Sequence, residues 1–334
     1  MYLPGKDAPA APKAEVRHIA FLAFDGVVPL DLVGPLQIFQ TASSMRARDG
    51  AGEAYSISVA SARGGEIVAA GGLRFLTTPV DTLTGVDTVI VPGGEYGMEI
   101  CSLQISGWLA ANAGRVRRVC SVCVGAFALA SAGLLRNRRA TTHWASCDRL
   151  ARDFPETRVE SDQLFVSDGP VWTSAGVSAG IDLAVHLVAE DLGQEIAYRV
   201  SKALVLAARR PGHASQSSAA LDLQYASGEQ FGKLTGWMIE NMAADLSVDT
   251  LARRCAMSPR TFARKFLAAT GMTPGSAVEA LRVDAARQYL HAGRRPLKAI
   301  AAACGFRNEQ HMRRAFIRLL GVPPTCLRDG TSGA

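Results

Sequence analysis

No hydrophobic run in the 334-residue sequence is long and uninterrupted enough to cross a bilayer. The start of the chain also lacks the basic stretch followed by an apolar stretch that marks a secretory signal. Both absences predict a cytoplasmic protein without a membrane partner. Hydrophobic residues make up 48% of the chain and charged residues 20%, which is typical of folded globular proteins and excludes an intrinsically disordered one. A chain of this length has room for two or three domains.

Paired cysteines and metal-ligand patterns are missing as well. The seven cysteines are odd in number and scattered over both halves, which excludes a disulfide framework. The six histidines do not show the spacing of a zinc site, so we expect no metal and no cofactor. Cys120 and Cys123 form a C-x-x-C pair, but on a buried strand their side chains would point to opposite faces. This pair therefore does not indicate a thioredoxin-like role.

Positive charge is distributed unevenly along the chain. Residues 228–334 contain 16 Lys and Arg against 8 Asp and Glu, a net charge of +8. Residues 1–227 contain 20 Lys and Arg against 22 Asp and Glu, a net charge of −2. Contact with nucleic-acid phosphates requires such a concentration of positive charge on one segment. The C-terminal segment is therefore expected to bind double-stranded DNA.

Residues 248–328 repeat one pattern twice: a short helix, a tight turn and a second helix with basic and amide side chains. In the first copy Ser247 is placed to cap the first helix, and Ser258-Pro259 begins the second. In the second copy Gly305 supplies the turn, and the second helix begins near Asn308. One such pair is also compatible with ordinary helix packing, but two copies with matching faces favour paired helix-turn-helix (HTH) units. The side chains expected to face DNA are Arg260, Thr261, Arg264 and Lys265 in the first copy and Asn308, Gln310, His311, Arg313 and Arg314 in the second.

These motifs resemble the DNA-binding domain of the AraC/XylS family, in which one long helix joins two HTH units. The resemblance covers residues 229–330 and implies a DNA-binding domain at 228–330, with promoter or operator DNA and RNA polymerase as partners. The sequence differs from the family pattern at Cys326, where an aromatic residue is usual, and at Asn308, where serine is common. The matching residues are Leu251-Ala252, Met257 to Phe266, Gly271 to Pro274, Leu281-Arg282, Ala285-Ala286-Arg287, Ile300-Ala301, Cys304-Gly305-Phe306, Arg313 to Phe316 and Gly321 to Pro324.

The N-terminal part alternates expected strands with expected helices from His18 onward. Such alternation predicts an α/β sandwich with a largely parallel sheet. Residues 1–14 are rich in Pro and Ala and are expected to form a disordered tail, whereas residues 207–227 lose periodicity and are expected to form a linker. The expected strands are 18–25, 55–60, 88–92 and 116–121, with a hairpin at 163–166 and 171–174, and the expected helices are 31–42, 104–113, one from 124, 179–190 and 194–206.

The strand at 116–121 runs directly into Val122-Cys123-Val124-Gly125-Ala126 and a helix. This pattern resembles a nucleophile elbow, a sharp turn that exposes a reactive side chain and requires small neighbours. We expect the N-terminus of the following helix to lower the thiol pKa of Cys123 and to bind an anion. A histidine, His143, follows another short strand, and Gly93-Gly94 offers backbone N–H groups for an oxyanion pocket.

Residues 16–195 resemble the PfpI branch of the class I glutamine-amidotransferase-like superfamily. This resemblance implies a flavodoxin-like, three-layer α/β/α domain at 15–206, with Cys123 as the elbow cysteine, His143 as its partner and Asp31 as the acid near the thiol. The order of the two domains is that of GlxA-type transcriptional regulators. The matching residues are Phe24-Asp25-Gly26, Asp31 to Leu36, Val91 to Gly94, Ser121 to Ala126, Ala140 to Trp144 and Thr173 to Gly176.

Three interpretations of the elbow stay open. A glutamine amidotransferase would carry a glutamate at position 145, where this chain has Ala145, so we expect no amidotransfer by that triad. The preferred interpretation is a ligand-responsive regulator, a homodimer whose pocket binds a small effector, such as an amino acid or related amine, without turning it over. The alternatives are a cysteine-dependent hydrolase, hydratase or glyoxalase-like enzyme, and a redox sensor with an exposed, low-pKa Cys123. The expected ligand-binding residues are Asp31, Gly93, Gly94, Cys123, Val124, His143 and Trp144.

Overall fold

The computed structural model describes residues 16–94, 97–207, 209–292 and 295–328. The chain separates into two compact units, residues 1–212 and residues 213–334. Across the described ranges, no helix combines the length and apolar character needed to traverse a bilayer. The expected N-terminal tail, residues 1–14, lies outside the described residues.

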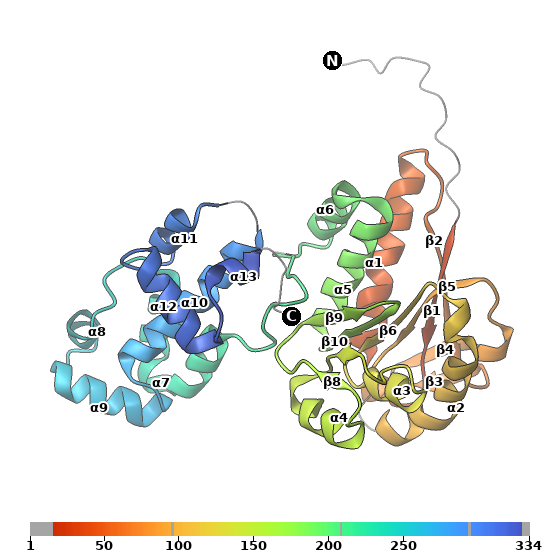
Figure 1. Cartoon of the computed structure of the whole chain (residues 1–334), viewed down its shortest axis with the longest axis horizontal. Helices are drawn as coiled ribbons and strands as arrows, with labels where there is room; N and C mark the ends of the chain where they lie inside the picture. The colour runs from red at the N-terminus through yellow and green to blue at the C-terminus, as the bar shows by residue number, and fades with distance from the viewer. Residues whose placement is uncertain (1–15, 95–96, 208, 293–294, 329–334) are drawn as a thin grey trace, which may run out of the picture. The chain divides into compact units, whose positions relative to one another are not determined.

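The first unit is built on an eight-stranded sheet with the order β3-β4-β2-β1-β5-β6-β10-β9 (Figure 1). All strand pairs from β4 to β10 are parallel, and the two edge strands β3 and β9 run antiparallel to their neighbours. This arrangement confirms the expected mostly parallel sheet. The strands are β1 (Arg17–Leu22), β2 (Tyr55–Ser61), β3 (Gly65–Val68), β4 (Arg74–Pro79), β5 (Val86–Val91), β6 (Arg118–Val122), β9 (Phe165–Asp168) and β10 (Val171–Ser174). Two further short strands, β7 (Arg139–Ala140) and β8 (Arg158–Val159), pair separately.

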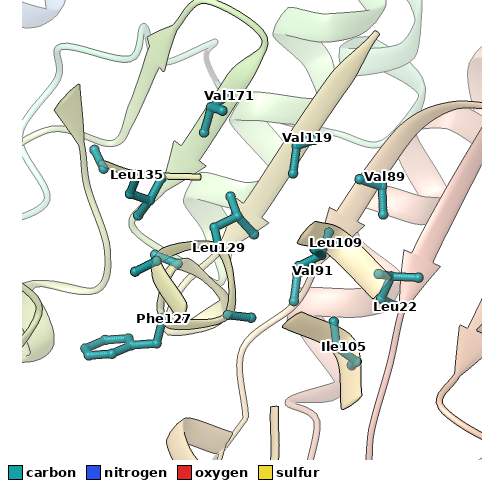
Figure 2. Packing of buried hydrophobic residues seen from close by; sticks show 14 of the residues in the cluster. Leu22, Val89, Val91, Ile105, Leu109, Val119, Phe127, Leu129, Leu135 and Val171 are labelled. Carbon is teal, nitrogen blue, oxygen red and sulfur yellow. The ribbon is translucent and has the colours of Figure 1, made fainter. Parts of the chain in front are cut away.

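Helices cover both faces of the sheet, which completes the three-layer sandwich (Figure 1). On one side α1 (Pro29–Arg48), α5 (Ser178–Leu192) and α6 (Gln194–Ala203) pack against one another. On the other side α2 (Gly97–Asn112) packs against α3 (Gly125–Ser131), and the short α4 (Cys147–Asp153) packs against β8. Figure 2 shows strand residues such as Val91 and Val119 packed against Leu109 of α2 and Leu129 of α3. Because both faces are covered, β6 is buried along its whole length.

The structure differs from the sequence expectations in two places within the sheet and linker. The hairpin β3–β4 was not expected, because its strands are short and mostly exposed and lack a clear alternation of apolar residues. The expected linker at 207–227 is too long, because helix α7 (Ala219–Glu240) already begins at Ala219. Ser218 caps this helix, and Gly228 kinks it at φ 50°. The polar residues at 215–218, directly before the helix, hid its start.

The second unit is entirely helical and contains two small cores joined by one long helix, α10 (Pro274–Ala292). Phe262 and Phe266 of α9 fill the first core, together with Phe231 of α7. Met312 and Phe316 of α12 fill the second core. Helix α10 contributes residues to both, which confirms the double HTH architecture expected from the sequence. The other helices are α8 (Val248–Arg254), α9 (Pro259–Thr270), α11 (Leu297–Ala303), α12 (Glu309–Leu320) and α13 (Pro324–Arg328).

Candidate ligand pocket and DNA interface

Cys123 lies in a sharp turn between the end of β6 and the start of α3. Its φ angle is 57°, a left-handed conformation that costs a non-glycine residue free energy and persists only where its surroundings enforce it. The backbone N–H of Cys123 donates to the carbonyl of Ser174 at 2.9 Å, and the hydroxyl of Thr142 donates to the carbonyl of Cys123 at 2.7 Å. Two neighbouring segments therefore hold the elbow in its strained conformation.

Two glycines let the backbone approach the thiol closely. A Cβ atom on Gly176, whose φ is 109°, would lie 2.5 Å from the Cβ and 2.9 Å from the Sγ of Cys123. A Cβ atom on Gly93 would lie 2.7 Å from Oδ2 of Asp31 and 2.8 Å from the Cβ of Cys123. Contacts this short exclude any side chain, so both positions require glycine in this arrangement. Gly176 was not among the expected site residues, although it ends one of the motifs of the family resemblance.

Asp31 lies at the start of α1, is fully buried, and connects three segments. Its Oδ1 accepts the N–H of Val177 at 2.7 Å, its Oδ2 accepts the N–H of Gly93 at 3.2 Å, and its carboxyl is also hydrogen-bonded to the thiol of Cys123. Burial raises the pKa of Asp31 above its ordinary value, and these hydrogen bonds together with the charge of His143 only partly offset that effect. Asp31 therefore joins the start of α1 to the ends of β5 and β10.

The thiol of Cys123 is protonated at neutral pH. Burial, followed by the negative charge of Asp31, raises its pKa to about 12, and the hydrogen bond from the N–H of Val124 only partly opposes this effect. The expectation that the helix N-terminus lowers this pKa is wrong, because burial and the neighbouring carboxylate outweigh the helix. The redox-sensor interpretation required an exposed thiol with a low pKa, whereas Cys123 is half-buried and its pKa is raised.

His143 is not in position to activate the thiol. Among the described residues, it forms no hydrogen bond with Cys123, and its Nδ1 accepts the N–H of Ala145 at 3.4 Å. The neutral ring therefore carries its proton on Nε2 and is a donor there. Trp144 lies beside His143 with a ring-centroid distance of 5.4 Å, and 67% of it is exposed.

The two glycines expected to form an oxyanion pocket have other roles. Because the N–H of Gly93 donates to Asp31, it is not available to an oxyanion. Gly94 pairs with Val27 in an antiparallel bridge, and an added Cβ there would meet the ring of Phe24 at 2.6 Å. Among the residues that the structure describes, no three His, Cys, Asp or Glu side chains converge on a possible metal position.

The second helices of the two HTH units, α9 and α12, are built alike. Ser258 and Asn308 cap their first turns by accepting the N–H groups of Thr261 and His311, respectively. Both helices end at a left-handed glycine. Each buries two apolar side chains four residues apart, so the remaining side chains form an exposed basic face. The expected residues that are exposed are Arg260, Arg264 and Lys265 on α9, Gln310, Arg313 and Arg314 on α12, and Asn308, which caps α12. Within the described part of the chain, none of these cations forms an ion pair.

Three of the expected DNA-facing residues also serve the local structure. The Oδ1 of Asn308 is occupied by its capping bond to His311, and the hydroxyl of Thr261 accepts a hydrogen bond from Ser258 at 2.9 Å. The ring of His311 packs edge-on against Phe306 at 5.7 Å, and its Nδ1 is buried without a partner among the described residues. The capping positions of Ser258 and Asn308 were the sequence signal that could have separated these roles.

Comparison with known proteins agrees with both units. The model of the DJ-1/PfpI family matches residues 17–190, just over half of the chain, and a helix-turn-helix domain model matches residues 251–330. The HTH-type transcriptional regulator Rv1931c of Mycobacterium tuberculosis is 31% identical over 258 residues, which cover 72% of this chain and 93% of that protein. The chain belongs to the HTH-type transcriptional regulators with a DJ-1/PfpI domain and an AraC-type DNA-binding domain. The HTH-type transcriptional regulator CdhR of Pseudomonas aeruginosa is 28% identical over 306 residues, 91% of this chain and 89% of CdhR.

One relative of this regulator has an enzyme name. Isonitrile hydratase of Pseudomonas putida is 31% identical over 199 residues, which cover 58% of this chain and 80% of that enzyme. The match is therefore too short to include the whole regulator. The match indicates a shared fold for the unit that contains the elbow. The chemistry available to this chain depends on the geometry around Cys123.

Proposed function

We propose that the first unit of this regulator binds a small metabolite in the pocket formed by Asp31, Cys123 and His143, without turning it over. Occupancy of the pocket then controls DNA binding by the second unit. The observation that carries the proposal is the buried carboxyl of Asp31, which is hydrogen-bonded to a protonated thiol and to two backbone N–H groups. Ligand sites are usually pre-formed and contain a few polar groups in fixed positions, and the N–H groups of Gly93 and Val177 fix Asp31 in this way.

Catalysis by the elbow is disfavoured on two grounds. A thiol with a pKa of about 12 contains almost no thiolate at neutral pH, and the thiolate is the nucleophile. His143 forms no hydrogen bond with Cys123 among the described residues, its Nδ1 accepts the N–H of Ala145, and no acid stands at position 145 to reorient the ring. These features support a non-catalytic first unit.

The chemistry of His143 and Trp144 favours an amino acid or related amine as the ligand class. The exposed indole of Trp144 offers a π-face for a cationic head group. The Nε2–H of His143 beside it is a donor for a carboxylate. A zwitterion has both groups within a few bonds of each other, and buried Asp31 adds negative potential to the pocket.

The DNA-reading residues proposed for the second unit are Arg260, Arg264 and Lys265 in one HTH unit and Gln310, Arg313 and Arg314 in the other. Arg and Gln side chains suit the edges of guanine and adenine in the major groove, and Lys is suited to phosphates. Their exposure and lack of ion-pair partners within the described ranges support this assignment. We also propose a cytoplasmic homodimer that acts on operator DNA and contacts RNA polymerase, and light scattering of the purified chain tests the dimer.

A ligand screen tests the sensing proposal. The full-length protein and its Cys123→Ser variant are heated with a panel of amino acids and amines, and every stabilising compound is then recovered and identified by mass spectrometry. A ligand at 100 times its Kd stabilises the folded state by about 2.7 kcal/mol. We expect a compound that stabilises both proteins and is recovered unchanged. Consumption of the compound by the wild-type protein alone would instead identify a cysteine-dependent enzyme.

A further inference from the structure

The pocket holds the start of helix α5 through two residues with unusual backbone angles. Gly176 has a φ of 109°, and Val177 has a φ of 44° and a ψ of −107°. Gly176 lies against Cys123, and the N–H of Val177 donates to Asp31. Ser178, the next residue, begins α5. A change in the hydrogen bonding of Asp31 therefore acts directly on the first turn of this helix.

Arg210 is bonded to the same end of α5. Its backbone N–H donates to Oδ1 of Asp182 at 3.2 Å, its Nε donates to Oδ2 of Asp182 at 2.9 Å, and its Nη2 donates to the hydroxyl of Ser178 at 2.9 Å. Only 8% of the Asp182 side chain is exposed, whereas 42% of the Arg210 side chain is, so the carboxylate is buried and the guanidinium is partly in water. A charge-assisted pair with several hydrogen bonds fixes geometry more tightly than a single contact. Arg210 thus follows the position of the first turns of α5.

The two residues after Pro211 are fixed within different units. The carbonyl of Gly212, the last residue of the first unit, accepts the N–H of Phe165 at 3.1 Å, and an added Cβ there would lie 2.4 Å from the carbonyl oxygen of Phe165. The carbonyl of His213, the first residue of the second unit, accepts a hydrogen bond from Arg287 of α10 at 3.4 Å. A single peptide bond therefore separates two residues that each have hydrogen bonds inside their own unit.

We propose that Arg210 transmits the state of the Asp31–Cys123 pocket to the DNA-binding unit. The route runs from Asp31 through Val177 to the start of α5, from Ser178 and Asp182 to Arg210, and along the backbone to His213. His213 is bonded to Arg287, which lies on the helix that joins both HTH units. The role of a metabolite in this route rests on the function proposed above, but the coupling itself can be measured without a ligand.

A double-mutant cycle in DNA affinity tests the coupling. Asp31→Asn serves as the perturbation, because an amide has one acceptor oxygen and faces the two N–H donors of Val177 and Gly93. The DNA is an operator selected from a random library with the wild-type, full-length protein. We expect Asp31→Asn to change the affinity for this operator by about fivefold or more. In the Arg210→Ala background the same substitution should change the affinity by less than about twofold.

Arg209→Ala is the matched control. Arg209 neighbours Arg210 but donates to Gln194 of α6 at 2.7 Å, away from the first turns of α5. The full effect of Asp31→Asn should persist in this background. A second variant, with Gly-Ser-Gly-Ser inserted between Gly212 and His213, leaves every side chain in place and should abolish the effect as Arg210→Ala does. It carries the test if Arg210→Ala does not fold.

Each outcome of the cycle decides between coupling and its absence. An effect of Asp31→Asn that is equally large with Arg210→Ala and with the insertion would overturn the route, as would the absence of any effect in the wild-type background. If the sensing proposal is wrong but the coupling through Arg210 is right, the metabolite panel yields no ligand, while Asp31→Asn still changes the affinity for DNA in the wild-type background and not in the Arg210→Ala background.

Discussion

The alkylation rate of Cys123 gives a direct measure of the environment on which the proposal of a non-catalytic first unit depends. At a pKa of about 12, ~0.01% of the thiol is ionised at pH 8, against ~10% for a thiol at its ordinary pKa of 9.0. Because only the thiolate reacts, iodoacetamide should modify Cys123 about a thousandfold more slowly than an exposed cysteine with an ordinary pKa. Peptide mass spectrometry of wild-type and Cys123→Ser protein assigns the modification to this residue.

The pH dependence separates ionisation from simple shielding. Shielding lowers the rate at every pH, whereas a raised pKa makes the logarithm of the rate rise by about one per pH unit up to at least pH 10, without a plateau. Asp31→Asn removes the charge that is the second cause of the raised pKa, so the rate at pH 8 should increase but stay below that of an exposed thiol, since burial remains. A plateau near pH 7 would refute the reasoning and reopen the nucleophile and redox interpretations.

The raised pKa of the thiol also has a consequence for stability. The folded state keeps the Cys123 proton up to about pH 12, whereas the unfolded chain loses it near the ordinary value of 9.0. The unfolded state therefore binds fewer protons between these values, and the free energy of unfolding falls as pH rises through that window. Below pH 9 both states are protonated, and this group contributes no pH dependence.

Three further predictions concern the rest of the chain. Arg118→Ala removes a partner of Asp191, whose side chain is 1% exposed, and should lower the free energy of unfolding in urea by about 3 kcal/mol. The pKa of Asp191 is lowered in the folded state, so the contribution of Asp191 to stability is present at neutral pH and is lost on acidification below about pH 4. Asn308→Ala removes an N-cap and should lower the melting temperature through a loss of about 1 kcal/mol, whereas Arg314→Ala should not. Arg313→Ala should weaken binding to the selected operator by about 1–3 kcal/mol and relax specificity at one base pair, and a uniform loss over all sequences would reassign it to a phosphate contact.

Local signals made the helical unit predictable. Ser247 and Ser258 cap helices α8 and α9 as expected, because a cap depends on the side chain and the three residues that follow it. The position of the elbow was equally local, since a buried strand, a small-residue turn and a helix follow one another directly around Cys123. Where a few neighbouring residues determine the local structure, the sequence alone was enough to predict it.

Long-range contacts account for what the sequence did not reveal. The thiol pKa depends on burial and on Asp31, which lies far from Cys123 in the sequence and reaches it only through the fold of the sheet. The N–H of Val177 donates to the same carboxylate, and no local sequence pattern indicates that a backbone N–H will form such a bond. The anchoring of Arg210 on Asp182 likewise joins a segment that was expected to be a linker to a buried helix.

The operator affinity of the full-length protein, measured by fluorescence anisotropy with and without the compound found in the ligand screen, tests the central claim most directly. We predict that saturating ligand shifts the affinity by about fivefold or more, in the Cys123→Ser variant as well as in the wild type, while the compound is recovered intact. A compound that binds the first unit tightly and leaves the affinity for DNA unchanged would contradict the account.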